Sequence, residues 1–283
     1  MTKVNNNLAW LLVLPALLLL ALVVLIPLTM VFNFSFHDIF TQDFKTWVGA
    51  QWYRDILGSS HFYASLGRSL LYSLLVLIIE IPLGILLALS LPRRNAFVAL
   101  FLVILSLPLL VPWNIIPMLW HVLISSDSFV AVFAAFGVDL DWKFNPIHTW
   151  IVLILMDVWH WTSLVLLLCY AGLSTIPKEY YQAAAIDKAS RWTVFKVVEF
   201  PRIIGVLLMA LLLRFMDSFM SYTEAFSLNA GGPKNATMFL AMDLAESIKA
   251  FDYGPASARS MIYFIIILTV VWFFKVAQKK YEH

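Results

Sequence analysis

The amino-acid sequence predicts an all-α, polytopic membrane protein with six transmembrane helices. Of its 283 residues, 62% are hydrophobic and 13% are charged, whereas soluble domains are about half apolar and a quarter charged. The chain contains six mostly apolar runs, most of them at or above the length of about 20 residues that a helix needs to cross a bilayer. Its 11 Trp, 10 Tyr and 22 Phe suit two membrane interfaces, where amphipathic rings are enriched.

The six apolar runs are bounded by charged or turn-forming residues. In chain order, they cover Leu8–Phe34, Leu66–Leu91, Ala96–Ile124, Trp150–Leu173, Ile203–Leu228 and Met261–Val276. The first is longer than the apolar region of about 7–15 residues in a cleavable signal peptide, so we expect a retained helix despite Pro15 and Pro27. The third is expected to cross as one span despite Pro108, Pro112 and Pro117. The sixth is short unless its helix begins several residues earlier.

The distribution of Lys and Arg predicts the orientation in the bilayer. Six spans place both termini on one side. Eleven of the nineteen basic residues fall in the N-terminus, the 92–95 and 174–202 loops and the C-terminal tail with Lys275 at the end of the sixth run, against seven on the opposite side. Basic residues are retained on the cytoplasmic side, so both termini are predicted to be cytoplasmic. We expect a single transmembrane domain over residues 1–283 that contacts the lipid bilayer.

Several kinds of site are absent from the sequence. There is no GxxxxGK[ST] phosphate-binding loop, and Gly231-Gly232-Pro233 lacks the Lys and Ser or Thr that such a loop needs. The six His show neither HExxH nor HxxxH spacing, and the single Cys169 allows no intrachain disulfide. No GxSxG elbow occurs. We therefore expect a chain that is not an enzyme, binds no metal or cofactor and has no nucleic-acid partner.

On the side rich in basic residues, the longest connection between two predicted spans is the polar loop from Ser174 to Pro201. Pro177 suits the first turn of a helix, and the residues after it favour helix. Ser190 is expected to cap a second helix, which Pro201 should end before the next span. Small alanines between bulky aromatic residues would let a partner approach the backbone closely. The alternative is an amphipathic helix that rests on the inner leaflet.

The residues of this loop resemble a known motif. The segment 176–192, which reads IPKEYYQAAAIDKASRW, and the later Val198-Glu199-Phe200-Pro201 resemble the EAA loop of binding-protein-dependent ABC transporter permeases. That loop has Glu-Ala-Ala, a Gly after three more residues and a distal Ile-x-Leu-Pro. Here Gln182 stands at the Glu position and Lys188 at the Gly position. Lys188 is expected to disfavour a left-handed turn, and the loss of the acidic group at Gln182 suggests that coupling is asymmetric between the two permeases of the complex.

The resemblance extends over nearly the whole chain and is strongest to the carbohydrate-uptake permeases of the maltose and glycerol-phosphate type. The segment 47–53, WVGAQWY, resembles the first external segment of that group, and Asn229-Ala230-Gly231-Gly232-Pro233 resembles its loop after the fifth span. The sequences of residues 157–163 and 214–220 also resemble those of permeases for sugar alcohols such as glycerol. The resemblance therefore implies the transmembrane domain of a type I ABC importer.

A complex is implied by this resemblance. The chain would pair with a second permease, and two ATP-binding subunits, which carry ATP and Mg, would bind the cytoplasmic coupling loop at 174–202. An external solute-binding protein would deliver the cargo, and the complex would lie in a bacterial inner membrane. The residues that the resemblance assigns to ATPase coupling are Glu179, Tyr181, Gln182, Ala183, Ala184, Asp187, Lys188, Ala189, Arg191 and Pro201.

Ionisable side chains in the fifth span are candidates for function because charge at membrane depth is costly. Arg214, Asp217, Ser221 and Glu224 recur at intervals of three, four and three residues, which predicts one face of an α-helix, with Ser218 beside them. The resemblance implies that Arg214, Ser218 and Ser221 contact substrate. The alternative is that Arg214 and Asp217 pair within the helix or with the partner subunit to hold an interface.

The fourth span adds Asp157, His160 and Trp161 to the predicted substrate pathway. An aromatic ring can stack on the apolar face of a sugar or polyol, while a carboxylate and an imidazole bind hydroxyl groups. The alternative is that His160 and Trp161 are packing residues. Glu80, in the second span, is expected to satisfy a broken backbone or to face the second permease.

The predicted function is therefore uptake of a small carbohydrate or polyol, with sugar or glycerol as cargo. One alternative is an organophosphate such as glycerol 3-phosphate, for which Arg214 would supply the positive charge. The other is an ion-coupled secondary transporter with Asp157, Asp217 and Glu224 as a proton relay. Such transporters are built from inverted repeats and broken helices, of which the sequence gives no convincing sign.

Overall fold

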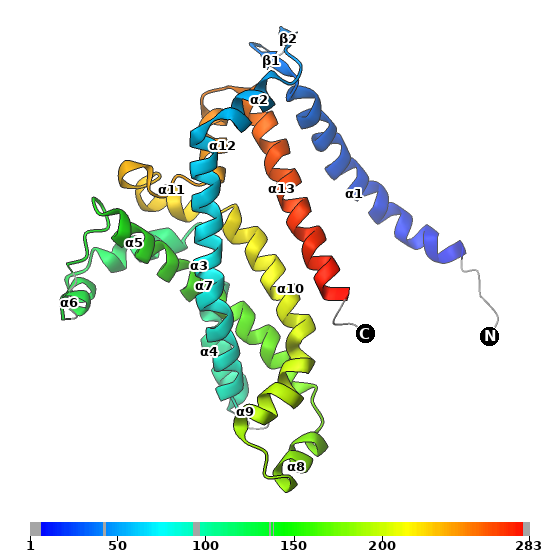
Figure 1. Ribbon diagram of the computed structural model, residues 1–283, viewed down its shortest axis with the longest axis vertical. Helices are drawn as coiled ribbons and strands as arrows, with labels where there is room; N and C mark the ends of the chain where they lie inside the picture. The colour runs from blue at the N-terminus through cyan, green and yellow to red at the C-terminus, as the bar shows by residue number, and fades with distance from the viewer. Residues whose placement is uncertain (1–6, 42–43, 93–96, 136, 138, 280–283) are drawn as a thin grey trace. The chain divides into compact units, whose positions relative to one another are not determined.

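The computed structural model describes residues 7–41, 44–92, 97–135, 137 and 139–279, and these form helices joined by short connections (Figure 1). Lys3, Arg93, Arg94 and Lys280, which entered the charge count, lie outside the described residues, so the orientation stays a prediction. The elements are α1 (Asn7–Phe34), β1 (His37–Ile39), β2 (Lys45–Trp47), α2 (Gln51–Gly58), α3 (Ser60–Ser90), α4 (Val98–Leu110), α5 (Ile116–Ile124), α6 (Asp127–Ala135), α7 (Pro146–Ser174), α8 (Lys178–Ile186), α9 (Arg191–Val194), a π-helical turn (Phe195–Glu199), α10 (Phe200–Phe219), α11 (Thr223–Asn229), a 3-10 turn (Pro233–Asn235), α12 (Leu240–Lys249) and α13 (Tyr253–Lys279).

Five helical segments in the described part of the chain are long and apolar enough to cross a membrane. They are Leu12–Phe34, Ser60–Ser90, Pro146–Ser174, Arg191–Asn229 and Tyr253–Val276. A shorter apolar helix, Val98–Leu110, stands where the third span is predicted. The sixth predicted span begins earlier than its apolar run, at Tyr253.

The third predicted span is wrong as one continuous helix, because α4 ends at Leu110 and α5 begins at Ile116. Val111 is extended, with φ −72° and ψ 125°. The residue before a proline is pushed out of the helical region by the proline ring, and Pro112 follows directly. The helix therefore stops where the sequence places the second of its three prolines.

The fifth predicted span differs at both ends. Pro201 does not end a helix, because α9, the π-helical turn and α10 follow one another without a gap from Arg191 to Phe219. Pro201 comes directly after the π-helical turn, in which the Phe200 amide donates five residues back to the Phe195 carbonyl. At the other end, α10 stops at Phe219, and α11 starts only at Thr223.

The chain divides into two compact units, of which the first comprises residues 1–62 and 244–266. In it, β1 pairs antiparallel with β2, and His37 lies opposite Trp47. The Trp52 indole N–H donates to the His37 carbonyl at 3.1 Å, and the Tyr53 hydroxyl donates to Ser35 Oγ at 2.6 Å. These bonds attach the hairpin to α2 and to the end of α1.

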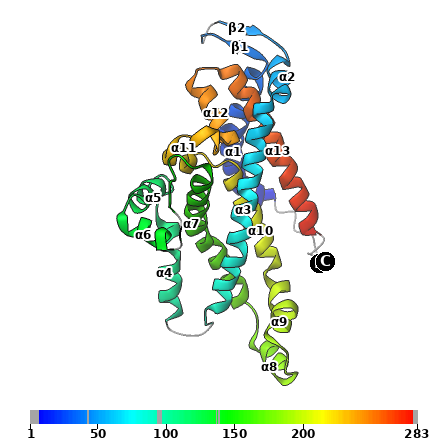
Figure 2. The same ribbon diagram turned by 60° about the vertical axis from the view of Figure 1, so that its left-hand side comes forward.

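The second unit comprises residues 63–243 and 267–283 and is built around α7. Helices α4 and α10 pack against α7 (Figure 2). The α7 side chains Val152, Leu153 and Val165 are fully buried. A Cβ atom at Gly84 of α3 would lie 2.6 Å from Val165 Cβ, so glycine is needed there for α3 to approach α7. The polar groups on α7 are thereby fixed within a packed core.

The loop between α7 and α10 contains the two predicted helices. Ser190 caps the second, since its Oγ accepts a hydrogen bond from the Thr193 amide at 3.1 Å. The expectation that Lys188 disfavours a left-handed turn is wrong, because Lys188 has φ +52°. The Lys188 amide donates to the Ala185 carbonyl and the Ala189 amide to the Ala184 carbonyl, which is the Schellman pattern that ends a helix. The two backbone bonds hold Lys188 in a conformation that usually requires glycine.

Lys188→Gly should stabilise this loop, because a left-handed backbone costs about 1–2 kcal/mol for a residue with a Cβ atom and little for glycine. We expect the α8 amides to exchange hydrogen about fivefold more slowly, the factor that corresponds to roughly 1 kcal/mol. Hydrogen-exchange mass spectrometry of the protein in detergent measures this. Lys178→Gly, at the helical start of α8, is the control and should speed exchange. Unchanged or faster exchange in Lys188→Gly would contradict the assignment.

Candidate functional site

The Arg214 guanidinium lies at the centre of a buried ionic cluster in the second unit. Its Nε donates to both carboxylate oxygens of Glu80, at 2.9 and 3.0 Å. Its two terminal nitrogens donate to Asp157 and to Asp217. Arg214, Glu80 and Asp157 are 1%, 0% and 5% exposed. One side chain of α10 therefore binds carboxylates from α3, α7 and its own helix.

The cluster is a consequence of charge at membrane depth. A guanidinium has five N–H donors in a planar fork, so it can serve three carboxylates at once. Because an isolated charge inside a bilayer is costly, each member needs its partner. Glu80 therefore neither satisfies a broken backbone nor faces outward, and that expectation is wrong. The predicted pairing of Arg214 with Asp217 within the helix is present, with two further partners.

Two contacts extend the cluster to aromatic residues. The Tyr72 hydroxyl donates to Asp157 Oδ2 at 3.1 Å. The Arg214 guanidinium lies over the Trp161 ring, 4.5 Å from its centroid, which is within the range of a cation–π interaction. Trp161 is thereby held on one side by the ionic cluster.

His160 joins α7 to the end of α4. Its Nδ1 donates to the Pro108 carbonyl at 2.8 Å, because a carbonyl can only accept. One turn away, the Ser163 hydroxyl donates to the Leu105 carbonyl at 2.7 Å. Pro112, four residues later, has no N–H to donate to this carbonyl, which accepts instead from the Val111 amide at 3.2 Å and from His160.

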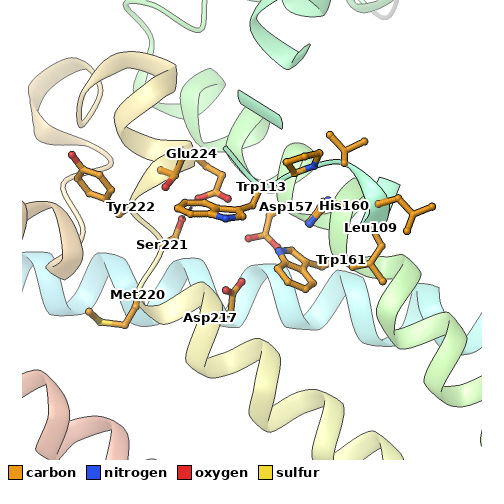
Figure 3. A pocket seen from close by; sticks show the side chains of 14 residues that line it. Leu109, Trp113, Asp157, His160, Trp161, Asp217, Met220, Ser221, Tyr222 and Glu224 are labelled. Carbon is orange, nitrogen blue, oxygen red and sulfur yellow. Dashed lines mark hydrogen bonds between the residues drawn. The ribbon is translucent and has the colours of Figure 1, made fainter. Parts of the chain in front are cut away.

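A cavity of about 610 Å³ opens beside the cluster, within the range of small-molecule sites. Figure 3 shows the Trp113 and Trp161 rings and the carboxylates of Asp157, Asp217 and Glu224 around it. Its lining comes from Leu109, Leu110, Val111, Pro112, Trp113, Asp157, His160, Trp161, Asp217, Met220, Ser221, Tyr222, Thr223 and Glu224. Irregular backbone at membrane depth is tolerated where it lines a cavity, and the breaks after α4 and after α10 both do so here.

The structure brings most of the predicted pathway residues together. Those that line the cavity are Asp157, His160, Trp161, Asp217, Ser221 and Glu224. Arg214 and Ser218 lie beneath it, each 1% exposed and neither in the lining. The cavity therefore presents the carboxylates to its interior while their arginine stays behind them.

The predicted single helical face is wrong beyond Phe219. Met220, with φ −106° and ψ 23°, leaves the helix. The Ser221 amide donates to the Ser218 carbonyl at 3.3 Å, a bond over three residues that tightens the last turn. The Ser221 hydroxyl donates to Glu224 Oε2 at 3.1 Å. Ser221 thus reaches the cavity from the segment between α10 and α11, and Glu224 from the first turn of α11, instead of from the face of α10.

Sequence reasoning missed the aromatic residues Trp113 and Tyr222, which line the cavity. Pro112 was the available signal for Trp113, because it marks a break within an apolar run. Nothing marks Tyr222, since no Pro or Gly lies between Phe219 and Thr223.

The chemistry of the lining suits a hydroxylated and uncharged molecule. Asp157, Asp217 and Glu224 supply hydrogen-bond acceptors, and the Trp113 and Trp161 rings supply stacking faces. No Lys or Arg stands among the described residues that line the cavity. A cavity of this composition repels anions.

The loop residues assigned to ATPase coupling form the surface of α8 and its flanks. No residue of α8 is buried. Glu179, Gln182, Ala183, Asp187 and Lys188 are exposed. Arg191 and, within α10, Pro201 are exposed as well. Tyr181, Ala184 and Ala189 are half-buried. The exposed face of α8 is open to a partner.

Comparison with known proteins identifies relatives over nearly the whole chain. The sequence model of the family described as "Binding-protein-dependent transport system inner membrane component" matches residues 80–283. The trehalose/maltose transport system permease protein MalF of Thermococcus litoralis is 30% identical over 267 residues, which cover 93% of this chain and 90% of that one. The probable starch degradation products transport system permease protein AmyD of Thermoanaerobacterium thermosulfurigenes is 25% identical and covers 92% and 90%.

A solved structure shares the fold. A crystal structure of a bacterial ABC transporter involved in the import of the acidic polysaccharide alginate matches with a TM-score of 0.81 at 18% identity, covering 96% of this chain and 95% of that one. The predicted all-α, polytopic fold class is confirmed by this match together with the five long apolar segments and the shorter α4.

Arg214→Met should destabilise the protein, because it leaves the buried carboxylates of Glu80 and Asp157 without a counter-charge. Breaking a buried pair in this way costs about 3–5 kcal/mol. We expect a lower midpoint of thermal unfolding in detergent. Adding Glu80→Gln should recover part of the loss, since one unpaired charge disappears. Asp217→Asn is the control and should lower the free energy of unfolding by less than about 1 kcal/mol, because that carboxylate is 51% exposed. Equal losses in Arg214→Met and Asp217→Asn would contradict the cluster.

Proposed function

This chain belongs to the family of binding-protein-dependent transport system inner membrane components, and we propose that it imports a small neutral carbohydrate or polyol as one permease subunit of an ATP-driven ABC importer. Like its relatives, it is a transport subunit and not an enzyme. The observation that carries the cargo proposal is the cavity lined by three carboxylates and two Trp rings at the breaks in two spans. Glycerol belongs to the proposed cargo class together with larger sugars.

The names of the relatives support a carbohydrate. Trehalose, maltose and starch degradation products are the cargoes in those names. Such molecules present hydroxyl groups to acceptors and apolar ring faces to aromatic side chains. The cavity offers both kinds of group around one space.

The organophosphate alternative has less support in the geometry. It needs the Arg214 guanidinium to bind phosphate, but Glu80, Asp157 and Asp217 already occupy its nitrogens. The carboxylates that line the cavity would repel a phosphate group. Family membership also sets aside an ion-coupled secondary transporter.

The proposed complex contains a second permease, two ATP-binding subunits and an external solute-binding protein. The exposed face of α8 would receive an ATP-binding subunit, which would hold ATP and Mg. A solved alginate transporter of the same fold is in complex with a pentasaccharide-bound periplasmic protein, which supports external delivery. The chain would span the cytoplasmic membrane with both termini in the cytoplasm.

ATP-driven uptake into liposomes tests the cargo class. The complex, reconstituted with its partner subunits and binding protein, should accumulate labelled glycerol or maltose but not glycerol 3-phosphate. Trp161→Ala should raise the half-saturating concentration about tenfold, the effect of losing roughly 1.4 kcal/mol of stacking. Trp272→Ala, an exposed tryptophan of α13 outside the cavity, is the control. Preferred uptake of glycerol 3-phosphate would contradict the proposal.

Ala183→Arg should prevent docking of the ATP-binding subunit. The alanine is exposed on α8, so a long charged side chain leaves the loop folded but blocks close approach of a partner. We expect about 30-fold weaker association, the scale of a lost interface hot spot of about 2 kcal/mol. Co-purification from membranes measures it, with Ala134→Arg on the exposed face of α6 as the matched control. Normal recovery of the complex would refute the docking assignment.

A further inference from the structure

We infer that Glu199 is a positioning residue that couples the docking helix α8 to the pathway helix α10. The inference rests on the proposed function, because it concerns how docking of an ATP-binding subunit reaches the cavity. Glu199 stands at the end of the π-helical turn, directly before α10. The family motif leaves its position open, as the x of Ile-x-Leu-Pro, so the resemblance gives Glu199 no role.

Glu199 is fully buried and joins two parts of the loop. Its Oε1 accepts a hydrogen bond from the Tyr181 hydroxyl of α8 at 3.3 Å. Its Oε2 accepts from the Arg191 guanidinium of α9 at 2.6 Å. Glu199 is 0% exposed, whereas Arg191 is 58% exposed. One carboxylate is thus bound by a donor from each loop helix.

This contact attaches α8 to the rest of the unit. No residue of α8 is fully buried, and the half-buried Tyr181 ring packs against the apolar cluster that contains Ile176 and Ile203. A second attachment lies close by, where Arg202, three residues after Glu199, donates to the hydroxyl of Tyr180 at 3.1 Å and lies 5.4 Å from its ring centroid. Two adjacent tyrosines of α8 therefore bind Glu199 and Arg202, on either side of the junction between the π-helical turn and α10.

A movement of α8 reaches the cavity through a single helical segment. The π-helical turn continues into α10, since the Phe200 amide donates to the Phe195 carbonyl. Arg214 follows Glu199 by fifteen residues, or about 22 Å along a helix at about 1.5 Å per residue. Arg214 in turn binds α3 and α7. The same helical segment therefore carries the loop contact at one end and the ionic cluster at the other.

The nature of the group favours transmission over mere packing. A buried carboxylate is costly, and an apolar residue would stabilise such a place at least as well. The carboxylate fixes the orientation of its two partners, because its hydrogen bonds hold a hydroxyl and a guanidinium at defined angles. Helical π-turns are often found at functional sites, and Glu199 closes one.

Uptake per ATP hydrolysed tests this role in the reconstituted complex, with labelled glycerol and maltose as the probes. Glu199→Gln keeps the shape of the side chain but loses its charge. We expect the ratio of uptake to ATP hydrolysis to fall about tenfold, as for a lost hydrogen bond to a charged group, while assembly and the midpoint of thermal unfolding stay unchanged. Tyr181→Phe should lower the ratio in the same direction. The double variant should lose no more than Glu199→Gln alone, because the contact that Tyr181→Phe removes is one that Glu199→Gln already disrupts.

Lys196→Gln is the matched control, since it removes a charge from an exposed position in the same π-helical turn, and its ratio should equal that of the unchanged chain. A normal ratio in both Glu199→Gln and Tyr181→Phe would overturn the inference and leave the proposed function standing. Loss of assembly in Glu199→Gln with a normal ratio in Tyr181→Phe would also overturn it, because the carboxylate would then be only structural. Absence of ATP-driven uptake in the unchanged complex would overturn the proposed function itself.

Discussion

The second unit depends on one guanidinium in a place where charge is costly. Arg214 binds Glu80, Asp157 and Asp217, so a cation on α10 holds carboxylates on α3 and α7 as well as one on its own helix. Lipid offers no water to either sign of charge. The groups must therefore satisfy one another, and the requirement fixes the three helices more firmly than the apolar contacts around them, which differ little from contacts with lipid.

The cavity follows from that arrangement and from two interrupted spans. Breaks after α4 and after α10 bring irregular backbone to the same space, where polar groups can be used by a passing molecule. Trp161 connects the two features, because its ring contacts the Arg214 guanidinium and also lines the cavity. A shift of the ionic cluster would move this ring and thereby change its contact with a cargo that stacks on it.

The loop that contains α8 and the cavity lie at opposite ends of one helical segment. Tyr181 and Arg191 hold the start of that segment through Glu199, and Arg214 and Asp217 lie near its far end. Energy released on a partner subunit can act on a transport pathway only through such a connected and stiff element. The arrangement gives the permease a short mechanical route that needs no chemistry of its own.

Composition and apolar run length determined the membrane class, and the loop motif determined the family, because both are local properties of the chain. Pro112 even carried the signal for the break after α4. The pairing of Glu80 with Arg214 joins residues 134 positions apart, and no periodicity reports such a contact. The end of α10 at Phe219 has no Pro or Gly to mark it. The left-handed Lys188 contradicts its own preference because two backbone hydrogen bonds hold it. Only the tertiary structure decided the ionic pair, since folding brings its distant partners together, whereas the other two features are local backbone conformations that run against the preferences of the residues in them.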